Sequence, residues 1–121
     1  MSKNVIEKRR SKPHIPSLGM NIYVCVRKRP IFEKEVKEGQ IDCVSTANPV
    51  IRVGEPKFKV DGITKFIENH DHVFDNVFGS ESTTEELYQH SVQPLLDQLF
   101  HNGIVTFFAY GQTGSGKTHT M

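Results

Sequence analysis

The sequence predicts an α/β fold, because three segments in its second half follow one another in a characteristic order. Residues 82–102 carry apolar side chains at helical spacing, residues 104–109 are almost continuously apolar, and residues 111–118 are rich in glycine. The first pattern indicates a helix with one apolar face, and the second indicates a strand buried on both faces. A helix, a buried strand and a glycine-rich loop in this order are typical of α/β proteins.

The charge of the chain is unevenly distributed. Residues 1–30 contain eight Lys and Arg and one Glu, whereas the remaining residues contain seven basic and thirteen acidic side chains. We therefore divide the chain into a flexible basic arm at residues 1–19, interrupted by prolines and a glycine, and one domain at residues 20–121. The arm either meets a polyanionic surface or is a solvated tail, and charge alone does not separate the two.

Composition excludes several classes of protein. The two cysteines form no disulfide framework or metal-binding spacing, and the six histidines are scattered, so we expect no metal site built from them. No apolar run approaches the ~18 residues of a membrane span, and no signal peptide opens the chain. We therefore expect a soluble intracellular protein with no membrane or nucleic-acid partner. The oligomeric state is left open.

The first half of the chain predicts short strands and loops. Apolar and β-branched residues indicate strands, whereas a stretch of alternating acids and bases without an apolar face indicates a surface loop. Two further apolar stretches flank a glycine-containing segment and form either two edge strands or one hairpin. In chain order, these are a buried strand at 21–26, a surface loop at 33–38, the strands at 50–53 and 58–60 around residues 54–57, and a strand at 72–78.

The helix predicted at residues 82–102 has its own start and stop signals. Ser82 followed by Glu85 fits a capping box, in which each side chain satisfies a backbone N–H of the first turn. Pro94 lies inside the helical pattern, so we expect it to bend the helix or remove one hydrogen bond. Gly103 is the expected residue just beyond the end of the helix.

The glycine-rich loop fits the phosphate-binding pattern G-x-x-x-x-G-K-[ST]. Glycines let successive backbone N–H groups point at phosphate oxygens, the lysine places a positive charge on the terminal phosphates, and the last hydroxyl can ligate Mg²⁺. The buried strand expected just before it is the context that this function requires, although a chance match to a short pattern is the alternative. The predicted site for ATP phosphates and Mg²⁺ comprises Gly111, Gln112, Thr113, Gly114, Ser115, Gly116, Lys117 and Thr118, with Thr118 as the Mg²⁺ ligand.

Hydrolysis needs more groups than this loop. Phosphoryl transfer depends on positioning the nucleotide, the metal and the attacking water together. The sequence continues for three residues beyond Thr118 and contains no later acidic residue that could hold Mg²⁺ or orient water. We therefore expect this chain by itself to hydrolyse ATP poorly or not at all.

Residues 108–121, F-A-Y-G-Q-T-G-S-G-K-T-H-T-M, resemble the phosphate-loop segment of kinesin motor domains. The likeness extends back to about residue 21. Residues 24–30 resemble the first motor strand with its R-x-R-P motif, and residues 72–78 resemble the strand written F-x-F-D-x-V-F. The resemblance implies the N-terminal portion of a kinesin-type P-loop NTPase motor core with an incomplete sheet. Its central strand at 104–109 would lie near the strand at 21–26, with the helix at 82–102 against one face.

The resemblance also implies a site for the adenine of ATP. In kinesins the adenine lies against the R-x-R-P segment and a tyrosine of the preceding helix, while a histidine after the loop lies near the nucleotide. Without the resemblance, the tyrosine would be a core aromatic, the arginines a solvated charge run, and the histidine a capping or surface residue. The implied adenine-side residues are Arg27, Arg29, Pro30, Tyr88 and His119.

A second resemblance concerns the class of kinesin. Lys59, Val60 and Asp61, followed by T-K-F-I-E at residues 64–68, are similar to the Lys-Val-Asp loop of the thirteenth, internal-motor class, which depolymerises microtubules. The three residues would then contact tubulin, and the basic arm would meet its acidic surface. An ordinary edge hairpin with solvated charges is the alternative. The chain departs from the class at Gly62 and Ile63, where one residue is usual, and at His72, and it contains neither kinesin switch motif.

Three functions follow from these patterns. The first is the ATP-binding part of a kinesin-like microtubule motor that uses ATP and Mg²⁺, binds tubulin and depolymerises microtubules when complete. Such a protein would act in the cytoplasm on the microtubule cytoskeleton, including the spindle. The second is a truncated, non-enzymatic microtubule-binding module that lacks ATPase activity. The third is a different P-loop NTPase such as a small-molecule kinase, which the F-A-Y-G-Q-T sequence disfavours.

Overall fold

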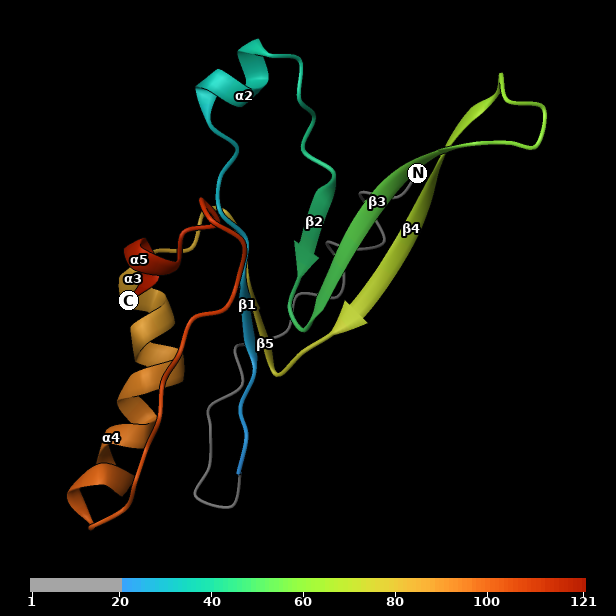
Figure 1. The fold of residues 1–121 in the computed structure, drawn as a ribbon. Coiled ribbons are helices and arrows are strands. Elements are labelled where there is room, and N and C mark those ends of the chain that lie inside the picture. Colours follow the sequence, from blue (N-terminus) through green and yellow to red (C-terminus); the bar gives the residue numbers. More distant parts are fainter. Residues whose placement is uncertain (1–20) are drawn as a thin grey trace.

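The computed structural model describes residues 21–121, so the arm predicted at residues 1–19 lies outside the described residues. Two small sheets and a run of helical segments make up a mixed α/β structure, which confirms the predicted class (Figure 1). In chain order the elements are β1 (Cys25–Arg27), α2 (Glu33–Lys37), β2 (Val44–Ala47), β3 (Val50–Phe58), β4 (Lys65–Val73), β5 (Asn76–Phe78), α3 (Thr84–Leu87), a π-helical turn (Tyr88–Val92), α4 (Gln93–Phe100) and α5 (Lys117–Thr120). No helix in the described part of the chain is long and apolar enough to cross a membrane.

The most deeply buried strand is β5, which pairs in parallel with β1. Residues 76–78 are all buried, and Val77 and Phe78 belong to a small apolar core with Ala47 and Ile51. The predicted strands at 21–26 and 72–78 are thus present but shorter. The second is divided, because β4 ends at Val73 and β5 begins at Asn76.

A long hairpin of β3 and β4 forms the three-stranded antiparallel sheet together with β2 (Figure 1). Both predicted alternatives, two strands at 50–53 and 58–60 or one hairpin around residues 54–57, were wrong, because β3 continues through Gly54 and Pro56 to Phe58 and the turn follows it. Strand β2 pairs only as far as Val53. Pro56 therefore lies where β3 has become an edge strand, and its missing N–H costs no bond to β2.

Residues 33–37 form the short helix α2, so the prediction of a surface loop at 33–38 was wrong. The helix has no buried residue, which explains why no apolar periodicity revealed it. Its first turn is stabilised by Glu35, whose carboxylate accepts a 2.8 Å hydrogen bond from the backbone N–H of Phe32. Acidic residues in the first turn and Lys37 in the last also complement the helix dipole.

The long predicted helix is present in three parts, and both of its predicted ends are shifted by one residue. Thr83, not Ser82, caps it, since the Thr83 hydroxyl accepts from the N–H of Glu86 and the Glu86 carboxylate accepts from the N–H of Thr83, both at 3.1 Å. At the other end Asn102, not Gly103, adopts the left-handed conformation, with a φ of 62°.

The π-helical turn immediately precedes α4, and Pro94 lies in the first turn of α4. A proline there needs no backbone donor, which is why the chain tolerates it.

The central strand predicted at 104–109 is not formed. The segment returns from the end of α4 toward α5 as unpaired chain (Figure 1), and Ile104 and Phe108 are 94% and 83% exposed. An apolar run becomes a buried strand only beside a strand that pairs with it. Among the described residues β1 pairs with β5, and no strand pairs with this segment.

Candidate functional site

An open pocket of about 450 Å³ joins segments from both ends of the described chain. On one side lies the Arg-Lys-Arg-Pro segment, on a second side the connection from α2 to β2, and on the third the glycine-rich loop. The structure thus brings Arg27, Arg29 and Pro30 beside four residues of the predicted phosphate site. The lining residues are Arg27, Lys28, Arg29, Pro30, Ile31, Glu35, Gln40, Ile41, Asp42, Cys43, Val44, Ile51, Gln112, Thr113, Gly114 and Ser115.

The glycine-rich loop turns sharply into α5. Gly114 and Gly116 have φ values of 83° and 99°, a left-handed conformation that other residues adopt only with strain. The Nζ of Lys117 donates a 2.7 Å hydrogen bond to the carbonyl of Gly111, so the lysine bridges the two ends of the loop. Thr118 follows in α5 and is exposed. The loop therefore curves sharply at its glycines, with the ammonium group held beside it, and its role in binding phosphate stays a prediction.

Arg27 connects β1 to two helical segments. Its Nη1 donates to the hydroxyls of Thr84 and Thr120 at 3.0 and 3.2 Å, and its Nη2 donates to the carbonyl of Ser82 at 3.4 Å. The guanidinium group therefore holds α3 and α5 together at the edge of the pocket. This bridging contact was not part of the sequence prediction, which placed Arg27 beside the adenine.

Arg29 is held by α2. Its Nη1 and Nη2 donate to the two carboxylate oxygens of Glu35 at 2.9 and 2.6 Å, and Nη1 also donates to the carbonyl of Pro30 at 3.1 Å. The Cζ of Arg29 lies 4.3 Å from the centroid of the Phe32 ring, so the planar group stacks on an aromatic face. These hydrogen bonds, mainly that from Arg29 and then that from the N–H of Phe32, lower the pKa of Glu35 to about 2.

Lys28, between the two arginines, is paired as well. Its Nζ lies 2.6 Å from a carboxylate oxygen of Asp42 and 2.6 Å from the carbonyl oxygen of Val44. Burial acts to raise the pKa of Asp42, but the hydrogen bonds from Lys28 and from the N–H of Val44 outweigh it, so this pKa is lowered. Two of the three cations in the Arg-Lys-Arg-Pro segment are thus neutralised by neighbouring acids.

Two of the predicted adenine-side residues lie elsewhere. Neither Tyr88, in the π-helical turn, nor His119, in α5, lines the pocket. Both side chains are at least partly exposed, Tyr88 by 43%. Their role beside a nucleotide stays a prediction.

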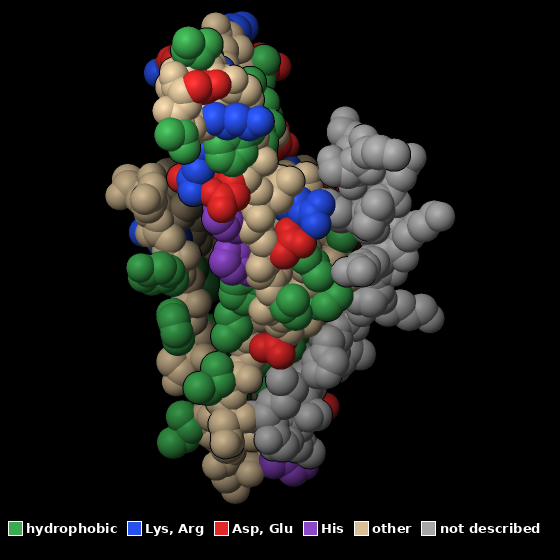
Figure 2. Space-filling model, turned by 90° about the vertical axis from the view of Figure 1, so that its right-hand side faces the viewer, with side chains coloured by type: hydrophobic (Ala, Val, Ile, Leu, Met, Phe, Trp, Pro, Cys, Tyr) green, Lys and Arg blue, Asp and Glu red, His purple; other side chains and the backbone are tan. Residues whose placement is uncertain are grey.

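The three residues of the predicted tubulin contact form the turn between β3 and β4. Val60 is fully exposed, and the carboxylate of Asp61 accepts 2.9 Å hydrogen bonds from the N–H groups of Ile63 and Thr64. Exposed apolar side chains surround this tip, which projects from the body of the molecule (Figures 1 and 2). The sequence analysis did not single out these neighbours, which are Phe58, Ile63, Phe66 and Ile67.

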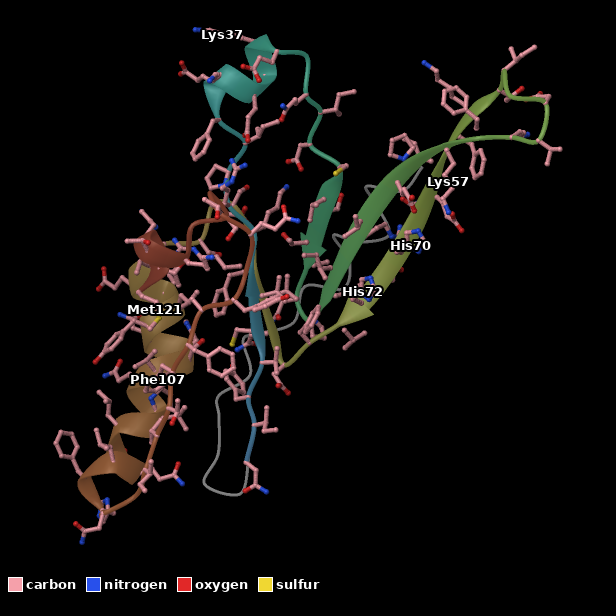
Figure 3. The ribbon with its side chains drawn as sticks, viewed as in Figure 1. Lys37, Lys57, His70, His72, Phe107 and Met121 are labelled. Carbon is pink, nitrogen blue, oxygen red and sulfur yellow. The ribbon has the colours of Figure 1, made fainter. Side chains whose placement is uncertain are left out.

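A cluster of side chains that the sequence analysis missed lies further down the hairpin. Oxygen and nitrogen atoms of Glu55, Glu68 and His70 lie within 4.8 Å of one another, and Figure 3 shows His70 and Lys57 on the hairpin, away from the pocket. Lys57 forms ion pairs with both glutamates. Spacing along the sequence could not reveal this group, because its members come from two strands that only the pairing register brings together.

Comparison with known proteins decides the family. The model of the kinesin motor domain matches residues 27–121, which is most of the chain. The chain belongs to the kinesin motor-domain family. This confirms the resemblance seen in the phosphate loop and the R-x-R-P motif, whereas membership of the thirteenth class finds no support in the comparisons and stays a prediction.

A solved kinesin structure is similar to this motor-domain chain. It is described as KIF14 (residues 391–755), ADP-bound, in complex with a microtubule, and it superposes with a TM-score of 0.70 at 31% sequence identity. The match covers 84% of the present chain but 28% of that one. The chain therefore spans less than a third of the length of this kinesin structure.

Proposed function

We propose that this chain is the nucleotide-binding part of a kinesin-type microtubule motor. The pocket carries the proposal, because it unites the glycine-rich loop with the Arg-Lys-Arg-Pro segment from the other end of the described chain. Separate ends that meet at one opening can hold the two ends of a nucleotide. The ADP named for the similar kinesin structure supports nucleotide binding by a protein of this family.

In this proposal the phosphates lie at the loop and the base lies toward residues 27–30. Lys117 supplies positive charge to the terminal phosphates, and backbone N–H groups of the glycine-rich loop donate to their oxygens, apart from that of Ser115, which donates to the carbonyl of Gln112 at 3.1 Å. Mg²⁺ fits the donors present, since Thr118 offers an exposed hydroxyl oxygen next to Lys117, and oxygen is the ligand that Mg²⁺ prefers. The ion would neutralise phosphate charge, and Tyr88 and His119 would flank the nucleotide.

Isothermal titration calorimetry of the chain with MgADP tests this site. The Lys117→Ala variant loses a charge-assisted contact of about 1.5–3 kcal/mol, which weakens binding roughly tenfold to a hundredfold. Lys65→Ala, on the hairpin, is the matched control and should bind like the wild type. Equal affinities of the wild type and Lys117→Ala would exclude the loop as the phosphate site.

We also propose that the motor's partner is the microtubule and that the β3–β4 tip contacts tubulin, in the manner of a depolymerase. The exposure of Val60, between Lys59 and the locally fixed Asp61, supports a contact made by the tip. This places the protein in the cytoplasm on microtubules, including those of the spindle. The oligomeric state is not part of the proposal.

Co-sedimentation with microtubules, with and without MgADP and at two salt concentrations, tests this second part. The combined variant Lys59→Ala, Val60→Ala and Asp61→Ala should reduce binding, while Lys34→Ala on α2 should not. Wild-type binding to microtubules that is equal with and without MgADP would favour the non-enzymatic microtubule-binding module instead. Undiminished binding by the triple variant would rule out the tip as the contact, and unchanged turbidity of stabilised microtubules would rule out depolymerisation by this chain.

A further inference from the structure

The acidic residue Glu35 lies in the wall of a pocket that we assign to an anionic ligand. A free carboxylate there would repel nucleotide phosphates. Glu35 is half-buried, however, and both of its oxygens are engaged by Arg29, while one also accepts the N–H of Phe32. The arrangement is a bidentate pair between a planar guanidinium and a carboxylate, the geometry in which such pairs are strongest.

This pair changes what Arg29 can bind. An unpaired arginine at the pocket would attract phosphate as readily as Lys117 does. With its charge offset by Glu35 and its Nη atoms engaged by Glu35 and Pro30, Arg29 has lost most of its attraction for anions. Lys28 is offset by Asp42 in the same way, whereas Arg27 donates to hydroxyl and carbonyl oxygens and has no carboxylate partner in the described part of the chain.

One flat face of the Arg29 guanidinium remains for stacking. The other face lies on the ring of Phe32, which does not line the pocket, whereas Arg29 itself does. A guanidinium plane stacks favourably on an aromatic ring, including a nucleobase. The pocket wall at Arg29 thus fits an uncharged planar group, and the glycine-rich loop, with Lys117 beside it, fits phosphate.

We propose that Glu35 is a positioning residue that holds Arg29 flat as a platform for the nucleobase and offsets the charge with which Arg29 would otherwise attract phosphate. The proposal rests on the nucleotide-binding function proposed above. It gives α2, a helix that buries no side chain, a role in orienting the nucleotide.

The test compares two ligands, MgADP and Mg-pyrophosphate, by calorimetry on the full chain. Glu35→Gln keeps the side-chain length and a residue suited to the first turn of α2 but removes the ion pair. We expect it to weaken MgADP binding threefold to tenfold and to leave pyrophosphate binding unchanged or tighter. Glu33→Gln removes the same charge from the same helix without touching Arg29, and it should change neither affinity.

A second variant separates the planar shape of the Arg29 side chain from its charge. Arg29→Lys keeps the charge but removes the plane, so it should weaken MgADP binding and spare pyrophosphate. The Arg29→Lys, Glu35→Gln double variant should bind MgADP no more weakly than the weaker-binding single variant, because both substitutions disrupt the same platform.

Equal losses for the two ligands in Glu35→Gln, or no loss for either, would overturn the positioning role. If the wild type binds Mg-pyrophosphate and binds MgADP no more tightly than that, the platform fails while the phosphate site stands. If the wild type binds neither ligand, the proposed function fails and the role of Glu35 fails with it.

Discussion

Arg27 in β1 donates a 3.2 Å hydrogen bond from its Nη1 to the hydroxyl of Thr120 in α5. The two residues are 93 positions apart in the sequence, and the same nitrogen also donates to Thr84 at the start of α3. One side chain therefore fixes the turn that follows the glycine-rich loop to the sheet and to the long helical segment. Arg27 therefore anchors α5, which follows the glycine-rich loop, and it also lines the pocket.

Replacing Arg27 with methionine should lower the free energy of unfolding by about 1.5–3 kcal/mol, because hydrogen bonds from a charged donor are lost. Thr120→Val should cost less, about 0.5–1.5 kcal/mol. Urea denaturation followed by circular dichroism measures both. The double variant should lose less than the two single losses combined, since they remove a shared bond. Strict additivity would show that the Arg27–Thr120 bond contributes nothing to stability.

Phe78 is the largest apolar side chain of the buried core, at 5% exposure. Phe78→Ala should destabilise the fold by about 3–5 kcal/mol, since it removes buried surface and leaves a cavity in the core. Phe108→Ala is the matched control at 83% exposure and should stay within about 0.5 kcal/mol of the wild type. The urea midpoint measures each effect. If Phe78→Ala lacks the far-ultraviolet circular dichroism signal of the fold even without denaturant, this counts as the predicted large loss of stability. Similar urea midpoints for the two variants would show that Phe78 is not part of the buried core.

Tyr23 makes the fold sensitive to alkali. Burial raises the pKa of its hydroxyl well above the ordinary value of 10.0, and this oxygen accepts a hydrogen bond from the fully buried Asn76. The unfolded chain would ionise first, so the stability linked to Tyr23 is fully present below pH 10 and is lost as the pH rises above it.

Between pH 8 and pH 11, the urea midpoint should therefore fall less in Tyr23→Phe than in the wild type. At pH 8 the variant should be less stable by about 1–3 kcal/mol, because a buried donor of Asn76 loses its acceptor. Tyr110→Phe, at a 97% exposed position, should keep the full alkaline fall. If Tyr23→Phe and the wild type lose equal stability at pH 11, the hydroxyl of Tyr23 is not the group that titrates.

The Arg29–Glu35 pair should persist in acid. The pKa of Glu35 is lowered from 4.5 to about 2, mainly by the hydrogen bonds from Arg29, so its stabilising effect is complete above pH 4.5 and disappears as the pH falls toward 2. Titration of the side-chain carboxyl carbon by NMR should give a midpoint near 2. In Arg29→Met the midpoint should move back toward 4.5. A wild-type midpoint near 4.5 would show that the pair does not form in solution.

Local patterns predicted the elements whose cause is local. The glycines at 114 and 116 belong to the predicted glycine-rich loop, and the structure has left-handed conformations at both positions. The short helix α5 that follows them was not among the predicted elements. The helix from 84 to 100 followed from its apolar spacing, but its caps were displaced by one residue. Ser82 and Thr83 both carry a hydroxyl, and only the path of the chain decides which one reaches a free N–H of the first turn.

The errors share one physical origin. An apolar run at 104–109 has the composition of a buried strand, yet a strand also requires a paired neighbour, and in the described residues the sheet of β1 and β5 does not extend to this segment. Helix α2 has no apolar face and depends on hydrogen bonds of Glu35 with Phe32 and Arg29. Neither property can be read from hydrophobic periodicity.

The sequence by itself determined the position of the glycine-rich loop and the kinesin family, because both are properties of contiguous residues such as G-Q-T-G-S-G-K-T. Only the tertiary structure decided that Arg29 is paired with Glu35 and that this pair shares a pocket with residues 112–115. Both depend on where distant segments meet in space, and a contact between such segments leaves no periodic or compositional pattern in the chain.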